Sequence, residues 1–279
     1  MLNEQNFNAV NFNSRRIPIA ATDQDNIVFN DFSLQDTDVI TTHLRHDSPP
    51  SRDFLTNKIP RADGEFSVGD FWRKKTITLR GIIHKSTSSL LEAKLSAFKK
   101  ALSVAESNLD IKVDDVIRRY VATWINPNRT FERRETYDIT KIPFEIQFDC
   151  LEPFGLATSY SAAEFLGKTS LALSVTADND GDIHAKASIG IIFSAASSIS
   201  KVNITNNTTG DEIEITRSFA AGEYLKINGE TREVEVDGTA VDYSGVFPTL
   251  ATGANSFTFT LTGTSANYSA TVKHRKPFL

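Results

Sequence analysis

The chain has 279 residues, which suggests about two domains, and its 40% hydrophobic and 23% charged residues are typical of a globular protein. Its net charge is -5: residues 1–150 hold 21 basic and 21 acidic residues, and residues 151–279 hold 9 basic and 14 acidic ones. A general nucleic-acid-binding protein would show a basic domain, and neither half is basic. The composition therefore argues against sequence-specific nucleic-acid binding.

Export and membrane signals are missing from the sequence. The N-terminal stretch MLNEQNFNAVNFNSRR lacks the apolar run of a signal peptide. No apolar run approaches the roughly 20 residues that span a bilayer, so we expect no membrane insertion. The single cysteine, Cys150, allows no intrachain disulfide. We expect a soluble protein that folds in a cytoplasm by packing alone and is exported, if at all, without a cleaved leader.

Residues 41–60, TTHLRHDSPPSRDFLTNKIP, hold three prolines, mixed charges and only isolated apolar residues. Because proline cannot donate to a sheet ladder, this segment is predicted to be an edge excursion or an extended arm. A loop near this length inside a compact domain is usually functional or disordered.

Residues 59–81, IPRADGEFSVGDFWRKKTITLRG, combine two turns, the aromatic pair Phe71 and Trp72, and a basic triplet. Gly64 and Gly69 do not form a phosphate-binding loop, because a strand rather than a helix follows them. Acidic residues flank the basic triplet, which argues against a nucleic-acid surface. The segment is predicted to be a strand–turn–strand element with the aromatic pair at its rim.

One amphipathic helix is predicted at about residues 89–105. Ser89 and Glu92 have the spacing of a capping box. An apolar stripe follows helical periodicity: Leu91, Leu95, Phe98 and Leu102. We favour a structural role for this helix, with its apolar stripe packed on a sheet.

The rest of the N-terminal half is predicted to be β structure. Residues 142–150, IPFEIQFDC, alternate without error, and residues 76–82, 109–113 and 119–124 also have strand patterns. The alternation of residues 142–150 places Cys150 on an apolar face, which is typical of a structural cysteine rather than an activated thiolate.

The composition changes at Pro153 and Gly155, where we place the boundary between residues 1–152 and 153–279. Beyond it the sequence predicts short strands separated by turns, at residues 170–176, 187–193, 201–205, 212–216, 223–227, 232–236, 256–262 and 268–274. Asn228-Gly229 favours a two-residue type I′ hairpin turn. Many short strands with frequent turns predict a β-sandwich or barrel.

No catalytic or cofactor-binding motif is present, so we predict no enzyme activity, no cofactor and no metal site. His43 and His46 lack further ligands at metal-binding spacing. Residues 178–182, DNDGD, differ from a calcium loop because glycine is fourth rather than sixth, so they are predicted to be a tight turn. Paired carboxylates contributed by distant strands, as in a glycan hydrolase, stay open as an alternative.

Taken in order, these features resemble the distal tail protein of long-tailed, non-contractile bacteriophages. The resemblance includes an Arg-x-x-Gly turn and an aromatic-basic strand, then the single helix, an Arg-Tyr-x-Ala strand, a Pro-aromatic pair and a late Phe-Pro turn. The matching residues are Arg61, Gly64, Lys75, Ile77, Gly81, Phe247, Pro248, Leu250, Gly253 and Asn255.

The resemblance implies a structural protein that forms a homo-hexameric ring at the distal end of the virion tail, made and assembled in the host cytoplasm. Residues 1–152 would form the ring, and residues 153–279 would form a galectin-like β-sandwich. The implied partners are the tail tube protein, the tail-associated hub protein and receptor-binding or side-fibre proteins on an outer platform. DNA would only pass through the channel.

We predict that the arm at 41–60 and the aromatic-basic segment contact a neighbouring subunit. The candidate interface residues are Leu44, Arg45, Arg52, Phe54, Leu55, Phe71, Trp72, Arg73, Lys74 and Lys75. The alternative function is a carbohydrate-binding module or lectin-like adhesion protein. Sugar sites commonly stack a sugar on tryptophan, but Trp72 and Trp124 both lie in the first half, and most aromatic residues of the second half are predicted to point inward.

Overall fold

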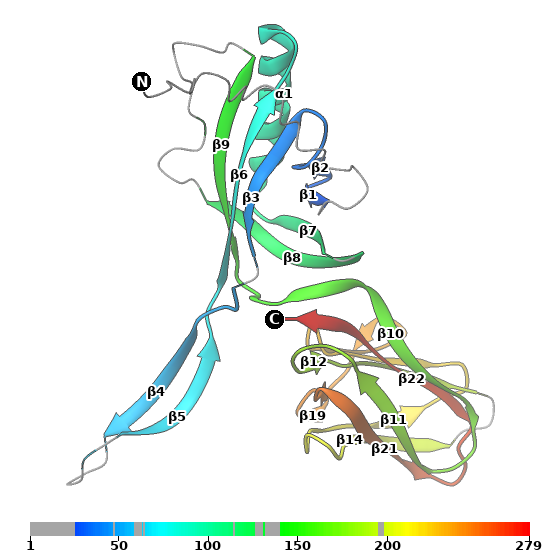
Figure 1. Ribbon diagram of the computed structural model, residues 1–279. Helices are drawn as coiled ribbons and strands as arrows, with labels where there is room; N and C mark the ends of the chain where they lie inside the picture. The colour runs from blue at the N-terminus through cyan, green and yellow to red at the C-terminus, as the bar shows by residue number, and fades with distance from the viewer. Residues whose placement is uncertain are drawn as a thin grey trace, which may run out of the picture.

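The computed structural model describes residues 26–46, 48–58, 63, 65–113, 115–125, 131, 140–194 and 198–279. Within these residues the protein is mainly β with a single helix, as predicted (Figure 1). Residues 1–25 and the turn residues Arg61, Ala62 and Gly64 lie outside the described residues.

The N-terminal half forms an antiparallel sheet system and a separate two-stranded hairpin. Its elements are β1 (Ile27–Phe29), β2 (Phe32–Ser33), β3 (Val39–Arg45), β4 (Arg52–Lys58), β5 (Glu65–Trp72), β6 (Lys75–His84), α1 (Ser88–Leu102), β7 (Ser107–Val113), β8 (Val116–Ile125) and β9 (Lys141–Cys150). Neighbours in the sheet run β3-β6-β9-β8-β7-β1-β2, while β4 pairs only with β5. The segment predicted to be an arm is therefore more regular than expected: its start belongs to β3 and its end to β4.

The predicted alternation of residues 142–150 is confirmed. Every second residue of β9 is buried, from Ile142 to Cys150. Ile77 and Leu79 of β6 face the same core. The helix α1 closes this core, because its stripe is buried as predicted and Phe98 lies 5.2 Å from Phe144 between ring centroids.

The helix begins earlier than the predicted capping box. The N-cap is Thr87, whose hydroxyl accepts a hydrogen bond from the Leu90 amide at 3.3 Å. The Ser89–Glu92 capping box is therefore wrong, because Ser89 already lies inside the first helical turn. Both Thr87 and Ser89 can cap, and the chain path out of β6 places Thr87 at the start.

The C-terminal half is a sandwich of two sheets around a second core. Its strands are β10 (Gly155–Lys168), β11 (Ala172–Asn179), β12 (Ala185–Lys186), β13 (Ser188–Phe193), β14 (Ile199–Asn206), β15 (Glu212–Phe219), β16 (Tyr224–Asn228), β17 (Glu233–Val236), β18 (Thr239–Ala240), β19 (Ser244–Gly245), β20 (Thr249–Leu250), β21 (Gly253–Gly263) and β22 (Tyr268–Phe278). One sheet continues β18-β17-β16-β13-β22-β10, and the other runs β11-β21-β14-β15-β19. The side chains between them form one apolar cluster.

The long strand β10 was missed by the sequence analysis and joins the two halves of the chain. It pairs with β22 along most of its length and with β8 at Leu156↔Arg119 and Ala157↔Arg118. One sheet therefore runs from the sandwich into the N-terminal half. The two apolar cores lie on either side of the predicted boundary between residues 152 and 153, which stays a prediction.

The hairpin predicted around Asn228-Gly229 forms, but its turn type is wrong. Asn228 pairs with Glu233, so the loop holds four residues rather than two. The Asn228 side chain accepts a hydrogen bond from the Glu230 amide at 3.0 Å, and Arg232 takes the positive φ. A Cβ at Gly229 would lie 2.2 Å from the carbonyl oxygen of Ala187. Glycine is therefore needed here because the backbones approach closely, not because the turn requires a positive φ.

The late Phe-Pro turn is held by a fully buried asparagine. The Asn255 amide donates to the carbonyls of Ala251 at 2.7 Å and Gly253 at 2.8 Å, and its oxygen accepts from the Ala251 amide at 2.8 Å. A second buried asparagine, Asn206, donates to the Asn255 side-chain oxygen. The motif residues therefore stabilise a turn in the sandwich core.

We expect Asn255→Ala to lower the free energy of unfolding by about 1–3 kcal/mol, because it leaves buried backbone groups without their partners. Denaturant unfolding followed by circular dichroism measures the change. The exposed Asn207, which bonds Thr258 at the surface, provides the control. Asn207→Ala is expected to change stability by less than about 0.5 kcal/mol. Equal effects of the two substitutions would contradict this role of Asn255.

Two buried groups predict a loss of stability at alkaline pH. Burial raises the pKa of Cys150 from 9.0 to about 12 and the pKa of Tyr268 from 10.0 to about 12. Folding keeps both groups neutral, so their contribution is complete below pH 9 and is lost as the pH rises towards 12. The free energy of unfolding should fall there by up to about 1.4 kcal/mol per pH unit for each group. Tyr268→Phe should remove its share of the slope in urea titrations; an unchanged slope would contradict the assignment.

Candidate interaction surface

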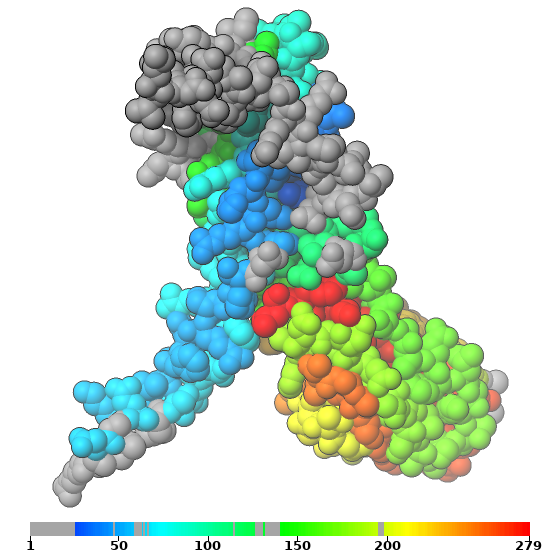
Figure 2. Space-filling view, in the orientation of Figure 1, coloured from blue at the N-terminus to red at the C-terminus, as the bar shows by residue number. Residues whose placement is uncertain are grey.

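The hairpin of β4 and β5 projects from the body as a separate arm, which we call the β4–β5 arm (Figures 1 and 2). It has no third strand and no helix against it among the described residues. A two-stranded hairpin alone is marginally stable in water. Because no third strand covers it, most residues of β4 are exposed to solvent.

Large apolar side chains lie on both faces of the arm. Phe54, Leu55 and Phe71 are 62%, 54% and 60% exposed, and Val68 is exposed beside a bulge. The pairing Asp53↔Phe71 and Leu55↔Gly69 puts Leu55 and Phe71 on one face. Phe54 lies on the opposite face. Exposed apolar groups gathered in this way mark an interaction surface.

The base of the arm is fixed by an aromatic stack. The Arg52 guanidinium lies 3.9 Å from the Trp72 ring centroid, and the Trp72 ring meets Phe154 edge-on at 5.7 Å. Phe154 belongs to the joint between β9 and β10. Ion pairs Arg52–Asp70 and Arg73–Asp53 tie the two strands together. The arm is therefore anchored to the joint, and the charges near its base are paired with one another.

The other predicted interface residues lie at the neck between the arm and the body. Arg45 is exposed at the end of β3, and Leu44 is half-buried against the core. Lys74 pairs with Asp149 of β9. Lys75 is only 4% exposed, and its ammonium lies 5.3 Å from the Tyr120 ring centroid. Lys75 is therefore not available to face a neighbour, because the alternation of β6 turns it inward.

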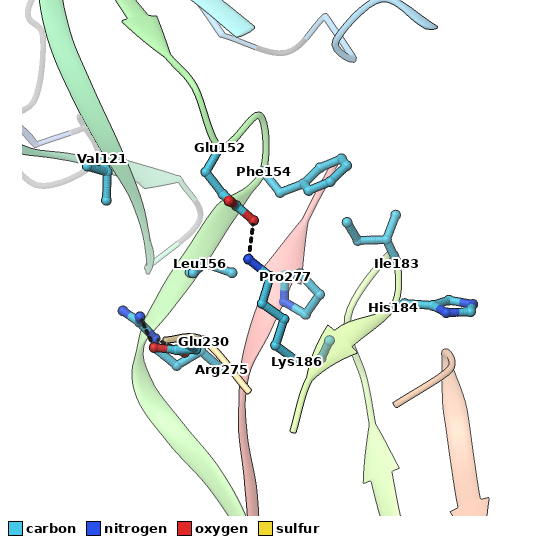
Figure 3. A pocket seen from close by; sticks show the side chains of 11 residues that line it. Val121, Glu152, Phe154, Leu156, Ile183, His184, Lys186, Glu230, Arg275 and Pro277 are labelled. Carbon is cyan, nitrogen blue, oxygen red and sulfur yellow. Dashed lines mark hydrogen bonds and ion pairs between the residues drawn. The ribbon is translucent and has the colours of Figure 1, made fainter. Parts of the chain in front are cut away.

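A cavity of about 230 Å³ lies at the joint (Figure 3). Its apolar lining comes from segments far apart in the sequence: Val121, Phe154, Leu156, Ile183 and Pro277. We call it the joint cavity. The sequence analysis missed it, because no local pattern links these strands; the Pro-aromatic pair was the only signal.

The charged groups around the joint cavity are paired with one another. Lys186 binds Glu152 at 2.7 Å, and Arg275 makes two hydrogen bonds to Glu230 at 2.8 and 2.6 Å (Figure 3). The hydrogen-bonded Glu230 raises the pKa of Arg275. The cavity therefore offers an apolar surface bordered by neutralised charges.

The described residues show no arrangement suited to metal binding. No group of three or more His, Cys, Asp or Glu side chains among them is placed to hold an ion. In the DNDGD turn, the buried Asn179 side chain binds the Ile183 carbonyl and the Gly181 amide, and Asp180 pairs with Lys276. Within the same part of the chain, no helix has the length and hydrophobicity to cross a membrane.

Residues 180–278 match the family model of the siphovirus-type tail component, C-terminal domain. No curated protein matches the chain. The crystal structure of SPP1 Dit (gp 19.1), described as a paradigm of the hub adsorption apparatus in phages that infect Gram-positive bacteria, superposes with a TM-score of 0.68. It shares 13% identity and covers 92% of this chain and 100% of that chain.

Two structures of the phage p2 baseplate in its activated conformation, with Ca and with Sr, match at 9% identity. Their TM-scores are 0.45 and 0.47, over 89% and 92% of this chain and 94% and 99% of theirs.

The fold shared with SPP1 Dit is, in this chain, mainly β with one helix among the described residues. The family match over residues 180–278, with the fold shared over most of the chain, confirms the resemblance to siphophage distal tail proteins. The model that matches residues 180–278 describes the C-terminal domain of a siphovirus-type tail component.

We expect Trp72→Ala to loosen the arm, because it removes both the Arg52 stack and the Phe154 contact. Each aromatic contact contributes about 0.5–1.5 kcal/mol, so tryptic cleavage between Arg52 and Arg73 should accelerate roughly fivefold. Limited proteolysis with mass spectrometry measures it. Tyr243→Ala, at an exposed aromatic of the sandwich, should leave arm cleavage unchanged. Accelerated cleavage throughout the body instead would show that Trp72 supports the whole fold.

Proposed function

We propose that the protein forms a hexameric ring at the distal end of a siphophage tail, with the β4–β5 arm as a subunit contact. The family match and the shared fold support a place in the tail tip. The arm carries the ring proposal, because its exposed apolar side chains need a covering surface that the described chain does not supply. The individual residues that we assign to the subunit contact lie on this arm or at its neck.

A ring requires each chain to present two different patches, one that reaches out and one that receives. The arm is the first patch, with Phe54, Leu55 and Phe71 as its apolar contacts. Arg45, Arg73 and Lys74 at the neck would set register at the rim of that contact, since rim charges favour one orientation over others. Lys75 is left out of this interface because it is buried.

In this proposal the N-terminal part, residues 1–152, lines the channel and joins the tail tube protein to the tail-associated hub protein. The sandwich, residues 153–279, points outward as a platform for receptor-binding or side-fibre proteins. The chain is made and assembled in the host cytoplasm and has no catalytic task. The family match supports the tail location, and SPP1 Dit is itself described as part of a hub adsorption apparatus.

Saccharide binding stays the alternative. Most aromatic residues of the sandwich point inward as predicted, including Phe257 and Phe259, but Tyr160, Tyr224 and Tyr243 are exposed on its surface. Affinity electrophoresis against bacterial cell-wall glycans separates the two functions, because the ring proposal requires no glycan retention.

We expect the wild-type chain to sediment as a six-chain species at high concentration. The triple variant Phe54→Ser, Leu55→Ser and Phe71→Ser should sediment as a single chain, because it removes the apolar contacts of the arm. Sedimentation velocity measures both. Leu166→Ser, at a similarly exposed position on the sandwich, should leave the assembly intact. A wild-type chain that stays single at every concentration, or an assembly indifferent to the triple variant, would overturn the proposal.

A further inference from the structure

The β4–β5 arm and the joint cavity have matching chemistry. The arm exposes Leu55 and Phe71 on one face, with Asp53 paired to Arg73 beside them. The joint cavity exposes apolar side chains between the pairs Glu152–Lys186 and Glu230–Arg275. Each surface neutralises its own charges, so a contact between them would bury no unpaired charge, which is the costly case.

The cavity also has a suitable size for an apolar side chain. An apolar cavity of about 150 Å³ admits benzene, and the joint cavity measures about 230 Å³. Phe71 and Leu55 are among the most exposed apolar residues of the described chain. An aromatic ring or a leucine side chain therefore fits the space that the joint offers.

A chain cannot fill its own cavity with this face of its own arm. Trp72 contacts Phe154, which lines the cavity at the joint. The arm face that carries Arg52, Trp72 and Phe54 is therefore the one turned towards the chain's own cavity. Leu55 and Phe71 lie on the opposite face, and the arm runs away from the body (Figure 1). The donor of these side chains must be a second copy.

We propose that the Leu55–Phe71 face of one chain docks over the joint cavity of a second copy of the chain. This inference rests on the proposed ring and names its receiving patch. The contact is heterologous, since donor and acceptor surfaces differ, and it repeats around a closed ring. It covers the joint that connects the N-terminal part to the sandwich, so assembly also fixes the orientation of the sandwich.

Cross-linking between singly labelled chains tests the proposal. Native Cys150 is buried, and burial raises its pKa to about 12, so an introduced cysteine is the reactive thiol. A Leu55→Cys chain is mixed with a Val121→Cys chain, whose new thiol lies at the cavity rim. A short bismaleimide is added, and the covalent pair is measured by mass spectrometry. We expect at least fivefold more pair than from either chain alone.

Phe54→Cys provides the matched control, since Phe54 is the next residue on the same strand, is similarly exposed and faces the other way. It should give at least fivefold less product with Val121→Cys. Equal yields from the Leu55 and Phe54 positions, or a preference for Leu166→Cys on the sandwich over Val121→Cys, would overturn the docking proposal.

Sedimentation separates this outcome from failure of the ring itself. If six chains assemble through the arm but the Val121 position does not cross-link to Leu55, the ring proposal survives and the acceptor surface is wrong. If the chains do not assemble, both proposals fail. Phe71→Ser alone should weaken assembly at least fivefold; an unchanged assembly would place the contact on the Phe54 face.

Discussion

The pairing of β10 with β8 on one edge and β22 on the other is the constraint on which the arrangement of the molecule depends. Without it, two β units with separate cores would be joined by the turn at Pro153 and by side-chain contacts such as Arg118 over the Phe278 ring. With it, one antiparallel sheet passes from the sandwich into the N-terminal half. The arm, whose base stacks on Phe154, takes its direction from the same place.

A glycine permits this junction. A Cβ at Gly155 would lie 2.8 Å from the Tyr120 ring, which is too close for any side chain to fit without displacing that buried tyrosine. Gly81 plays a comparable part in the N-terminal sheet, where a Cβ would lie 2.3 Å from the carbonyl oxygen of Ile40. Both positions were noticed in the sequence, the first as part of a joint and the second within the phage-like strand. Both positions require glycine because a neighbouring strand approaches too closely to leave room for a Cβ.

The local periodicity of apolar residues correctly predicted which faces of single strands and helices are buried. The alternation of residues 142–150 identified the buried face of β9, and the stripe from Leu91 to Leu102 identified the buried face of α1. It failed where small or polar residues occupy a strand, as in β10, in which Ala163 and Phe165 are the side chains packed against the sandwich core. It also misplaced a helix start and a hairpin turn, because neighbouring residues competed for one cap and because Gly229 packs against Ala187.

The candidate interface could be predicted only in part. Proline content and isolated apolar residues pointed to the arm, but its faces became distinct only with the register of β4 on β5. That register separates Phe54 from Leu55 and Phe71. Lys75 was included because it is the last residue of the basic triplet that begins at Arg73, yet the pleat of β6 turns it inward. The joint cavity had no linear signature, since strands from both halves of the chain build it.

The unequal lengths of the two ladders on β10 have a mechanical consequence. A pull on the sandwich directed away from the N-terminal half would act on only two registered residue pairs between β10 and β8, whereas nine pairs hold β10 to β22. The short ladder yields first because fewer hydrogen bonds share the force. The sandwich would then swing on the Pro153 tether as an intact body, so tension would reorient the sandwich before it unfolded it.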